Sequence, residues 1–255
     1  MNRGSLSFSL FGVPIEIQPF AWLLLAFLGG ACRINDGSDL MPVLIFMVAG
    51  MISVIAHELG HALVGRKLMG GSPYIQIGGM GGVTVNESIR YGSRWHFFAM
   101  VLGGPLAGFL PALLAFVLLV LQSGSFSGSL AFVECTTFPF FASVADYNAA
   151  GAVGYSLYDV DADQFSLMYD VYTSFFMVGI WWTILNLLPI FPLDGGKLLG
   201  TLLNNFKVAS MVGIVFSALF LLFGLYSESV YNCIIAAYIA YLNWQHFQQF
   251  RSTQG

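Results

Sequence analysis

The chain has 255 residues, of which 57% are hydrophobic and 9% are charged, with 9 Lys and Arg against 13 Asp and Glu. A soluble domain has roughly 25% charged residues, so this composition argues against a soluble globular enzyme and excludes a disordered chain. The net charge of -4 and the lack of a basic run disfavour nucleic-acid binding. A mean hydropathy of +0.78 indicates a polytopic membrane protein in which residues 1–255 form one domain.

Apolar runs of about the length of a membrane-spanning helix occur six times along the sequence. They cover residues 19–31, 41–64, 95–121, 171–190, 208–226 and 230–247. We therefore expect an all-α polytopic membrane protein with about six transmembrane helices.

The segments between these runs differ in charge. Basic residues follow the second and fourth runs, at Arg66, Lys67, Arg90, Arg94, Lys197 and Lys207, whereas residues 122–170 contain acids and no Lys or Arg. The positive-inside rule then places both termini and residues 65–94 and 191–207 in the cytoplasm, with an acidic extracytoplasmic loop at 122–170. We expect a multi-pass integral protein of a prokaryotic inner or plasma membrane.

Three cysteines are present, Cys32, Cys135 and Cys233, and no two of them form a CxxC pair. They indicate neither a disulfide framework nor a cysteine metal site. Cys32 and Cys135 fall on the same side of the membrane in this topology, and their pairing stays open because spacing alone does not establish a disulfide.

Two stretches on the cytoplasmic side have a strand-like pattern. Residues 5–18 alternate around Gly12 and Pro14, and residues 73–85 contain two short β-type runs around a glycine-rich centre at 78–82. Together they predict a small sheet or hairpin, and a flexible glycine loop is the alternative for 78–82.

The sequence His57-Glu58-Leu59-Gly60-His61 lies within the second apolar run. Two histidines four residues apart share one face of a helix, a geometry that binds one Zn²⁺ through two imidazoles. The intervening Glu58 can act as general base on a zinc-activated water. A charge at mid-membrane costs about 2.5–3.5 kcal/mol on insertion scales, so an intramembrane Glu indicates a functional site. The alternative is a helix end at which these side chains meet lipid headgroups or polar partners.

A catalytic zinc site needs a third protein ligand. His96 and His246 lie near the ends of apolar runs, where an interfacial aromatic residue is the simpler interpretation. Asp194 follows Pro189 and Pro192, which break the fourth run, and precedes two glycines that permit a sharp turn. Irregular backbone at membrane depth occurs where it is buried or lines a water-filled cavity. From the residues alone, Asp194 is either a metal ligand or an acid at a helix terminus in cytoplasmic solvent.

These motifs resemble those of the site-2 proteases, which are intramembrane zinc metalloproteases. The resemblance rests on the segment 57–61, on residues 186–196, which match the family's NxxPxxPLDG pattern, and on the glycine-rich residues 103–108. The last segment also predicts close packing of two helices through small residues. The sequence shows no PDZ module in the acidic segment and no CBS module after the last run, and so resembles minimal members of the family.

The resemblance implies a core formed by the runs at 41–64, 95–121 and 171–190. It also implies one Zn²⁺ per chain, bound by His57, His61 and Asp194, with Glu58 as the general base. Asn186 would then position the substrate or polarise the scissile carbonyl, and a helix–helix hydrogen bond is nearly as good an interpretation.

The implied function is an intramembrane zinc endopeptidase that cleaves single-span membrane protein substrates in or near their transmembrane segments, as in regulated intramembrane proteolysis. An exposed strand edge near Ile77 and Val83 is expected to pair with the unwound substrate. The alternatives are a catalytically idle scaffold, against which all four site residues argue, and a metal transporter, which would show intramembrane acids in several spans. The oligomeric state stays open.

Overall fold

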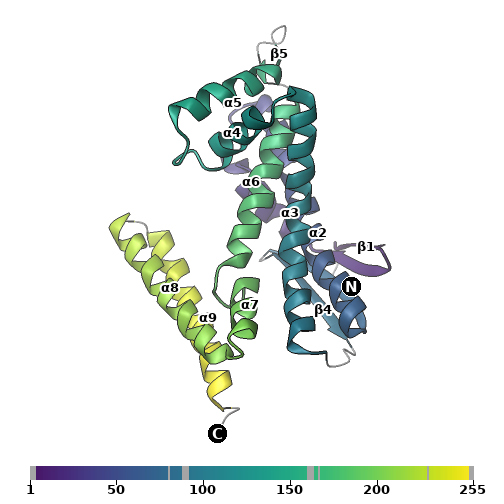
Figure 1. Cartoon of the computed structure of the whole chain (residues 1–255), viewed down its shortest axis with the longest axis vertical. Coiled ribbons are helices and arrows are strands. Elements are labelled where there is room, and N and C mark those ends of the chain that lie inside the picture. Colours follow the sequence, from purple (N-terminus) through teal and green to yellow (C-terminus); the bar gives the residue numbers. More distant parts are fainter. Residues whose placement is uncertain are drawn as a thin grey trace.

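The computed structural model describes residues 4–79, 81–87, 92–159, 164–165, 167–228 and 230–252. Most of these residues are helical (Figure 1). Seven of the described helices are α1 (Pro19–Leu28), α2 (Leu40–Met69), α3 (Arg94–Ser123), α6 (Leu167–Leu187), α7 (Asp194–Leu202), α8 (Phe206–Tyr226) and α9 (Val230–Ser252), and two more lie between α3 and α6. Two short 3₁₀ turns, Ala31–Arg33 and Gly37–Asp39, connect α1 to α2.

Three described helical segments are long and apolar enough to cross a membrane, namely Gly37–Met69, α3 and α8. They agree with the predicted helical membrane fold, whereas the number of six spans stays a prediction. α6 and α9, with 21 and 23 residues, are about as long as α8 but are not among these three segments. α1 has 10 residues, and these rise about 15 Å, half of the roughly 30 Å hydrocarbon thickness.

α2 and α3 pack closely because glycines face each other across their contact. A Cβ on Gly60 would collide with the backbone of Gly103, and one on Gly104 would collide with the ring of His61. The close packing predicted for residues 103–108 is therefore confirmed, and it fixes the α2 face that carries the histidines.

Four strands form one sheet in the order β1-β2-β3-β4: β1 (Leu6–Leu10), β2 (Val13–Ile17), β3 (Ser72–Gly78) and β4 (Gly81–Glu87). β1–β2 and β3–β4 are antiparallel pairs, and β2 lies parallel to β3. Alternate residues of β2 and β3, such as Ile15 and Ile75, are buried against α1 and α2. The two predicted strand-like stretches thus form one sheet. Of the glycine-rich residues 78–82, Gly78 ends β3 and Gly81 begins β4, whereas Met80 lies outside the described residues.

The acidic segment that was expected to be a loop contains two helices, α4 (Phe126–Thr137) and α5 (Val144–Ser156), and the short strands β5 (Tyr158–Asp159) and β6 (Gln164–Phe165). Ser125 caps α4, and Ser143 forms a capping box with Asp146 at the start of α5. The hydrogen bonds from Ser143 lower the pKa of the Asp146 carboxyl. Apolar side chains of both helices join one buried cluster with α3 and α6, in which α4 packs on α3 and α6 and α5 packs on α4. The segment therefore forms a helical layer at the end of α3 and α6 (Figure 1).

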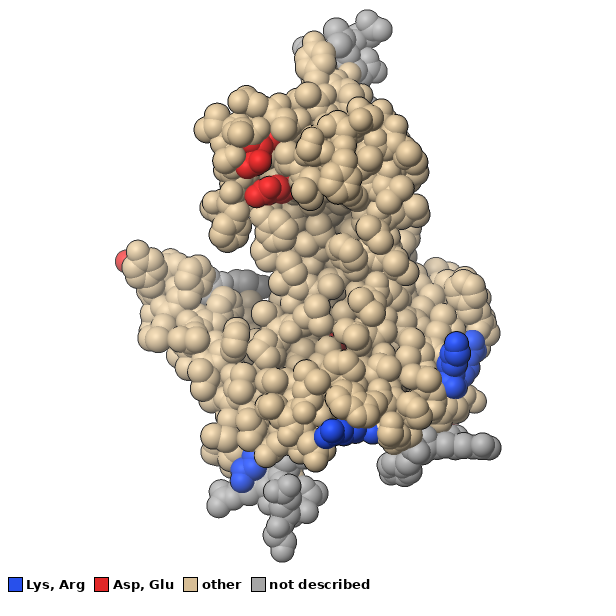
Figure 2. Space-filling model, in the orientation of Figure 1, with Lys and Arg blue, Asp and Glu red and all other residues tan. Residues whose placement is uncertain are grey.

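Charged side chains gather at opposite ends of the molecule. On the face drawn in Figure 2, Lys and Arg lie at the lower end and Asp and Glu higher up, with uncharged surface between them. α2 ends near Arg66 and Lys67 and α3 begins at Arg94, whereas α4 and α5 carry Glu134 and Asp146 at the far end of α3. All three cysteines are free, so the structure does not pair Cys32 with Cys135.

Candidate metal centre

α2 brings two histidine rings together on one face. His57 is 2% exposed, and His61 is partly buried one turn later. Their Nε2 atoms lie 3.2 Å apart, as the spacing of four residues predicts.

The junction between α6 and α7 brings Asp194 to the same point. α6 ends at Leu187, the two prolines interrupt the helix, and α7 begins at Asp194 itself, which is 3% exposed. Its Oδ2 atom lies 3.1 Å from Nε2 of His57 and 3.0 Å from Nε2 of His61. The helix terminus is therefore turned inward, and Asp194 does not lie in solvent.

The three atoms have the spacing of metal ligands. Bond lengths of about 2.0–2.1 Å in tetrahedral zinc sites separate neighbouring ligand atoms by about 3.3 Å, close to the 3.0–3.2 Å between these three atoms. His61 Nδ1 lies 2.9 Å from the carbonyl oxygen of Met100, which can only accept, so this nitrogen holds a proton and leaves Nε2 free to coordinate. Asp194 Oδ2 is buried and has no hydrogen-bond partner among the described residues. One cation would satisfy all three atoms, so the residues fit a metal ion.

Lys197 holds the other oxygen of the carboxylate. Its Nζ atom donates to Asp194 Oδ1 at 2.9 Å from the next turn of α7. The two oxygens of the carboxylate therefore have different partners: Oδ1 accepts from the lysine, and Oδ2 faces the two imidazoles. Hydrogen bonds of this kind orient metal ligands.

The β-sheet reaches the centre through β4. The hydroxyl of Thr84 donates to Glu58 Oε2 at 2.6 Å and also lies 3.0 Å from the Glu58 carbonyl oxygen. A Cβ on Gly82 would collide with the Glu58 side chain. Glu58, 4% exposed, is thus held between its own helix and the edge strand.

Asn186, the further residue predicted to act on the substrate, has a hydrogen-bond partner within its own helix. The Asn186 amide donates to the Trp182 carbonyl at 2.9 Å, one turn earlier in α6. Among the histidines that were weighed as third ligands, His96 is exposed at the start of α3, and the His246 ring packs at a tilt against the Phe191 ring with centroids 4.8 Å apart.

Ile77, for which a substrate-pairing role was predicted, lies on an inner strand of the sheet and not at its edge. β3 has hydrogen-bonded strands on both sides, and the Ile77 carbonyl accepts from the Gln18 N–H at 2.8 Å. Its backbone is therefore not available to another strand. Val83 lies on the edge strand β4 and is 59% exposed.

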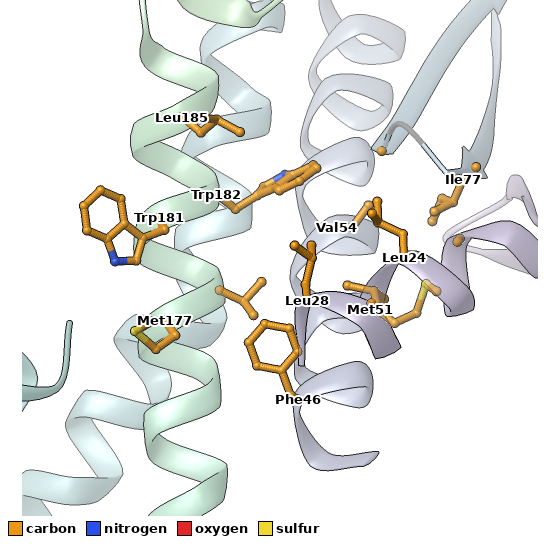
Figure 3. A pocket seen from close by; sticks show the side chains of 15 residues that line it. Leu24, Leu28, Phe46, Met51, Val54, Ile77, Met177, Trp181, Trp182 and Leu185 are labelled. Atoms are coloured by element: carbon orange, nitrogen blue, oxygen red, sulfur yellow. The ribbon is translucent and has the colours of Figure 1, made fainter. Parts of the chain in front are cut away.

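An apolar pocket of about 370 Å³ lies beside the centre, between α1, α2, α6 and the ends of β3 and β4. Its wall includes Val54, Met177 and Trp182, and Figure 3 shows Trp182 pointing from α6 toward α2. The Trp182 ring also makes an edge contact with the His57 ring, with centroids 6.5 Å apart. One side chain therefore borders both the pocket and the metal centre.

Thr84, Lys197 and Trp182 were not identified as site residues from the sequence. The i,i+3 spacing of Lys197 from Asp194 on α7 is a local signal that indicates a pair once Asp194 is known to begin a helix. Thr84 has no such signal, because its contact with Glu58 depends on how the sheet packs on α2.

Comparison with known proteins identifies relatives of this chain in both sequence and fold. The sequence model of peptidase family M50 matches residues 45–223. A zinc metalloprotease of Methanocaldococcus jannaschii is 24% identical over 246 residues, which are 94% of this chain and 59% of the length of that relative. The site-2 protease structure from the same organism shares the fold, with a TM-score of 0.52, 21% identity and 95% of each chain covered. Because the family match takes in most of the chain and all three candidate ligands, the chain belongs to peptidase family M50, the site-2 proteases.

Proposed function

We propose that the chain is an intramembrane zinc endopeptidase, in which residues 1–255 act as one membrane-embedded domain. The observation that carries this proposal is that Asp194 of α7 meets His57 and His61 beside the buried Glu58 of α2, a helix that is apolar enough to cross a membrane. Zinc is the metal expected from the family.

The residues divide the chemistry between them. His57, His61 and Asp194 would hold the zinc ion, which when bound supplies Lewis acidity toward a water molecule and the scissile carbonyl. Glu58 takes the proton of the attacking water and returns it to the leaving amine. Thr84 and Lys197 keep the carboxylates of Glu58 and Asp194 oriented. Asn186 remains a candidate for contacting the substrate backbone or the oxyanion.

The substrate is the unwound transmembrane segment of a single-span membrane protein. A helix hides its carbonyl groups in internal hydrogen bonds, so the substrate has to be extended at the scissile bond. The free edge of β4 offers backbone partners for such a strand. Because Thr84 of the same strand contacts Glu58, a paired substrate lies beside the general base.

The apolar pocket favours a large apolar side chain next to the scissile bond. Its volume of about 370 Å³ falls in the range of ligand pockets, and Trp182 connects it to His57. Transmembrane segments are rich in Leu, Phe and Ile, which match such a pocket.

The orientation that accompanies this proposal places both termini and the sheet in the cytoplasm, and α4 and α5 outside. It is supported by basic residues at the ends of α2 and α3 and by acids on α4 and α5. The cellular site is the inner or plasma membrane of a prokaryote, and cleavage takes place near the cytoplasmic face.

The test is cleavage of a panel of tagged single-span substrates by purified protein in liposomes. Wild type is compared with Glu58→Gln, which keeps the size of the side chain but removes its basicity. We expect cleavage by wild type and a loss of at least 1,000-fold in the variant, while both retain one zinc ion per chain. Equal cleavage by both proteins would overturn the assignment.

A further inference from the structure

The segment that links α6 to Asp194, at the start of α7, is not helical. Pro189 and Pro192 have no N–H to donate, and Phe191 lies between them, 3% exposed. Among the described residues, no backbone group bonds the N–H or the C=O of Phe191. Buried backbone groups without partners are costly, especially within a membrane.

Asn243 of α9 satisfies both groups. Its side-chain oxygen accepts from the Phe191 N–H at 3.0 Å, and its amide nitrogen donates to the Phe191 carbonyl at 3.0 Å. The second amide hydrogen goes to the Ile239 carbonyl at 2.8 Å, one turn earlier in α9. Asn243 is 0% exposed, so three hydrogen bonds fix its carboxamide in an interior position.

The neighbouring helix leaves room for this side chain. A Cβ on Gly213 of α8 would collide with the Asn243 carboxamide. The ring of His246, close after Asn243 in α9, packs at a tilt against the Phe191 ring. α9 therefore contacts both the backbone and the ring of Phe191, and α8 packs against the Asn243 carboxamide that makes the backbone contact.

The fixed backbone leads directly to the candidate metal ligand. The Leu193 N–H donates to the Ile190 carbonyl at 2.9 Å, and Asp194 is the next residue. A Cβ on Gly196 would collide with the backbone of Ile190 and Phe191, so the first turn of α7 rests on the same segment. A displacement of Phe191 would move the Asp194 carboxylate relative to the two imidazoles, and metal affinity is sensitive to such shifts.

We propose that Asn243 is a positioning residue that holds the Asp194 ligand in place from α9, through the two hydrogen bonds to Phe191. This inference rests on the zinc centre proposed above. The side chain of asparagine offers a donor and an acceptor in one plane, which matches the paired N–H and C=O of Phe191. Leucine has a similar size and neither group.

The experiment measures zinc affinity of the purified full chain by competition with a chromophoric chelator, together with the visible absorption spectrum of the Co²⁺-substituted protein. We expect Asn243→Leu to weaken zinc binding by 10- to 100-fold, as for other residues that orient metal ligands, and to change the Co²⁺ spectrum. Asn243→Gln is expected to fall between Leu and wild type. Gln245→Leu, which removes an exposed amide from the same helix, is the matched control and should bind zinc like wild type.

Gly213→Ala provides a second route to the same displacement without changing Asn243. Each variant is judged only if it keeps the wild-type helical content, and Asn243→Ser is the milder replacement should the Leu variant not fold. Wild-type affinity and an unchanged Co²⁺ spectrum in folded variants would overturn the positioning role while leaving the protease assignment intact. If wild type itself fails to bind one metal ion, the proposed function fails first.

Discussion

Thr84 contacts the general base from another element, and its hydroxyl donates to the Glu58 carboxylate at 2.6 Å. Replacement by Val keeps the shape and removes the donor. Because a hydrogen bond to a charged group is worth about 1.5–3 kcal/mol, we expect Thr84→Val to lower kcat about 10- to 100-fold, with KM and zinc content near those of wild type.

Thr84→Ser keeps the hydroxyl and should recover most of the activity. Steady-state kinetics on one peptide substrate, with zinc content measured on the same samples, checks both results. A Ser variant as slow as the Val variant would argue that Thr84 acts through packing alone.

At the residue scale, the spacing of His57 and His61 was sufficient to predict their common face, because four residues are one helical turn. Asp194 became a firm prediction only through the family pattern, since its position depends on how two prolines redirect the chain. Asn243 could not be predicted at all. Its partner Phe191 lies 52 residues away in the sequence, and a single buried Asn carries no local signal.

At the scale of elements, the sheet presents two edges that differ in function. β4 borders Glu58, whereas β1 lies at the opposite edge. Proline removes a backbone donor and tolerates few strand positions. We expect Val83→Pro to lower cleavage at least tenfold while zinc stays bound.

Leu6→Pro, on the exposed edge of β1, is the matched control and should cleave close to the wild-type rate. Initial rates and zinc content of both variants provide the comparison. An equal loss of activity in the two proteins would show that damage to the sheet, and not the β4 edge, is responsible.

The pocket between α1, α2 and α6 makes a prediction about substrate preference. Met177 lines the pocket, and Met177→Trp would fill part of it. We expect the variant to cleave substrates with Leu or Phe beside the scissile bond at least tenfold less well, relative to Ala, because pocket fit is worth about 1–3 kcal/mol.

The measurement is kcat/KM for substrate pairs that differ at this one position. Met211→Trp places the same side chain on α8, where Met211 is 51% exposed, and should leave the preference unchanged. An unaltered preference in Met177→Trp would show that the pocket does not bind the substrate side chain beside the scissile bond.

The strands were predictable because alternation and glycines are local signals. α4 and α5 were missed because their apolar stretches are short and their segment is acidic. The caps at Ser125 and Ser143 were present in the sequence, but serines are common in loops as well. Burial in one apolar cluster with α3 and α6 supplies the remaining stability of these helices.

At the scale of the whole molecule, the segregation of charge leads to a prediction about topology. Cys32 is exposed in the connection between α1 and α2, on the outer side in the proposed orientation. In a chain with Cys135→Ser and Cys233→Ser, we expect a membrane-impermeant maleimide to label Cys32 in intact cells.

Ser72→Cys, at the exposed start of β3, should be labelled only after the cells are permeabilised, in a background that also carries Cys32→Ser. Gel shifts of the labelled chain distinguish the two positions. The reverse pattern would invert the proposed orientation.

The parallel pairing of β2 with β3 has a consequence for how the protein is made. The chain leaves the sheet at Ile17, passes through α1 and α2, and returns at Ser72, because parallel strands require a crossover connection. During synthesis the β1–β2 hairpin can form early, but it has no third strand until α2 has left the ribosome. The strand edge beside Glu58 therefore arises only after the helix that carries Glu58 has been synthesised. The order of synthesis therefore determines when α2 and β4 can meet at the centre. A chain whose synthesis is incomplete lacks part of that centre.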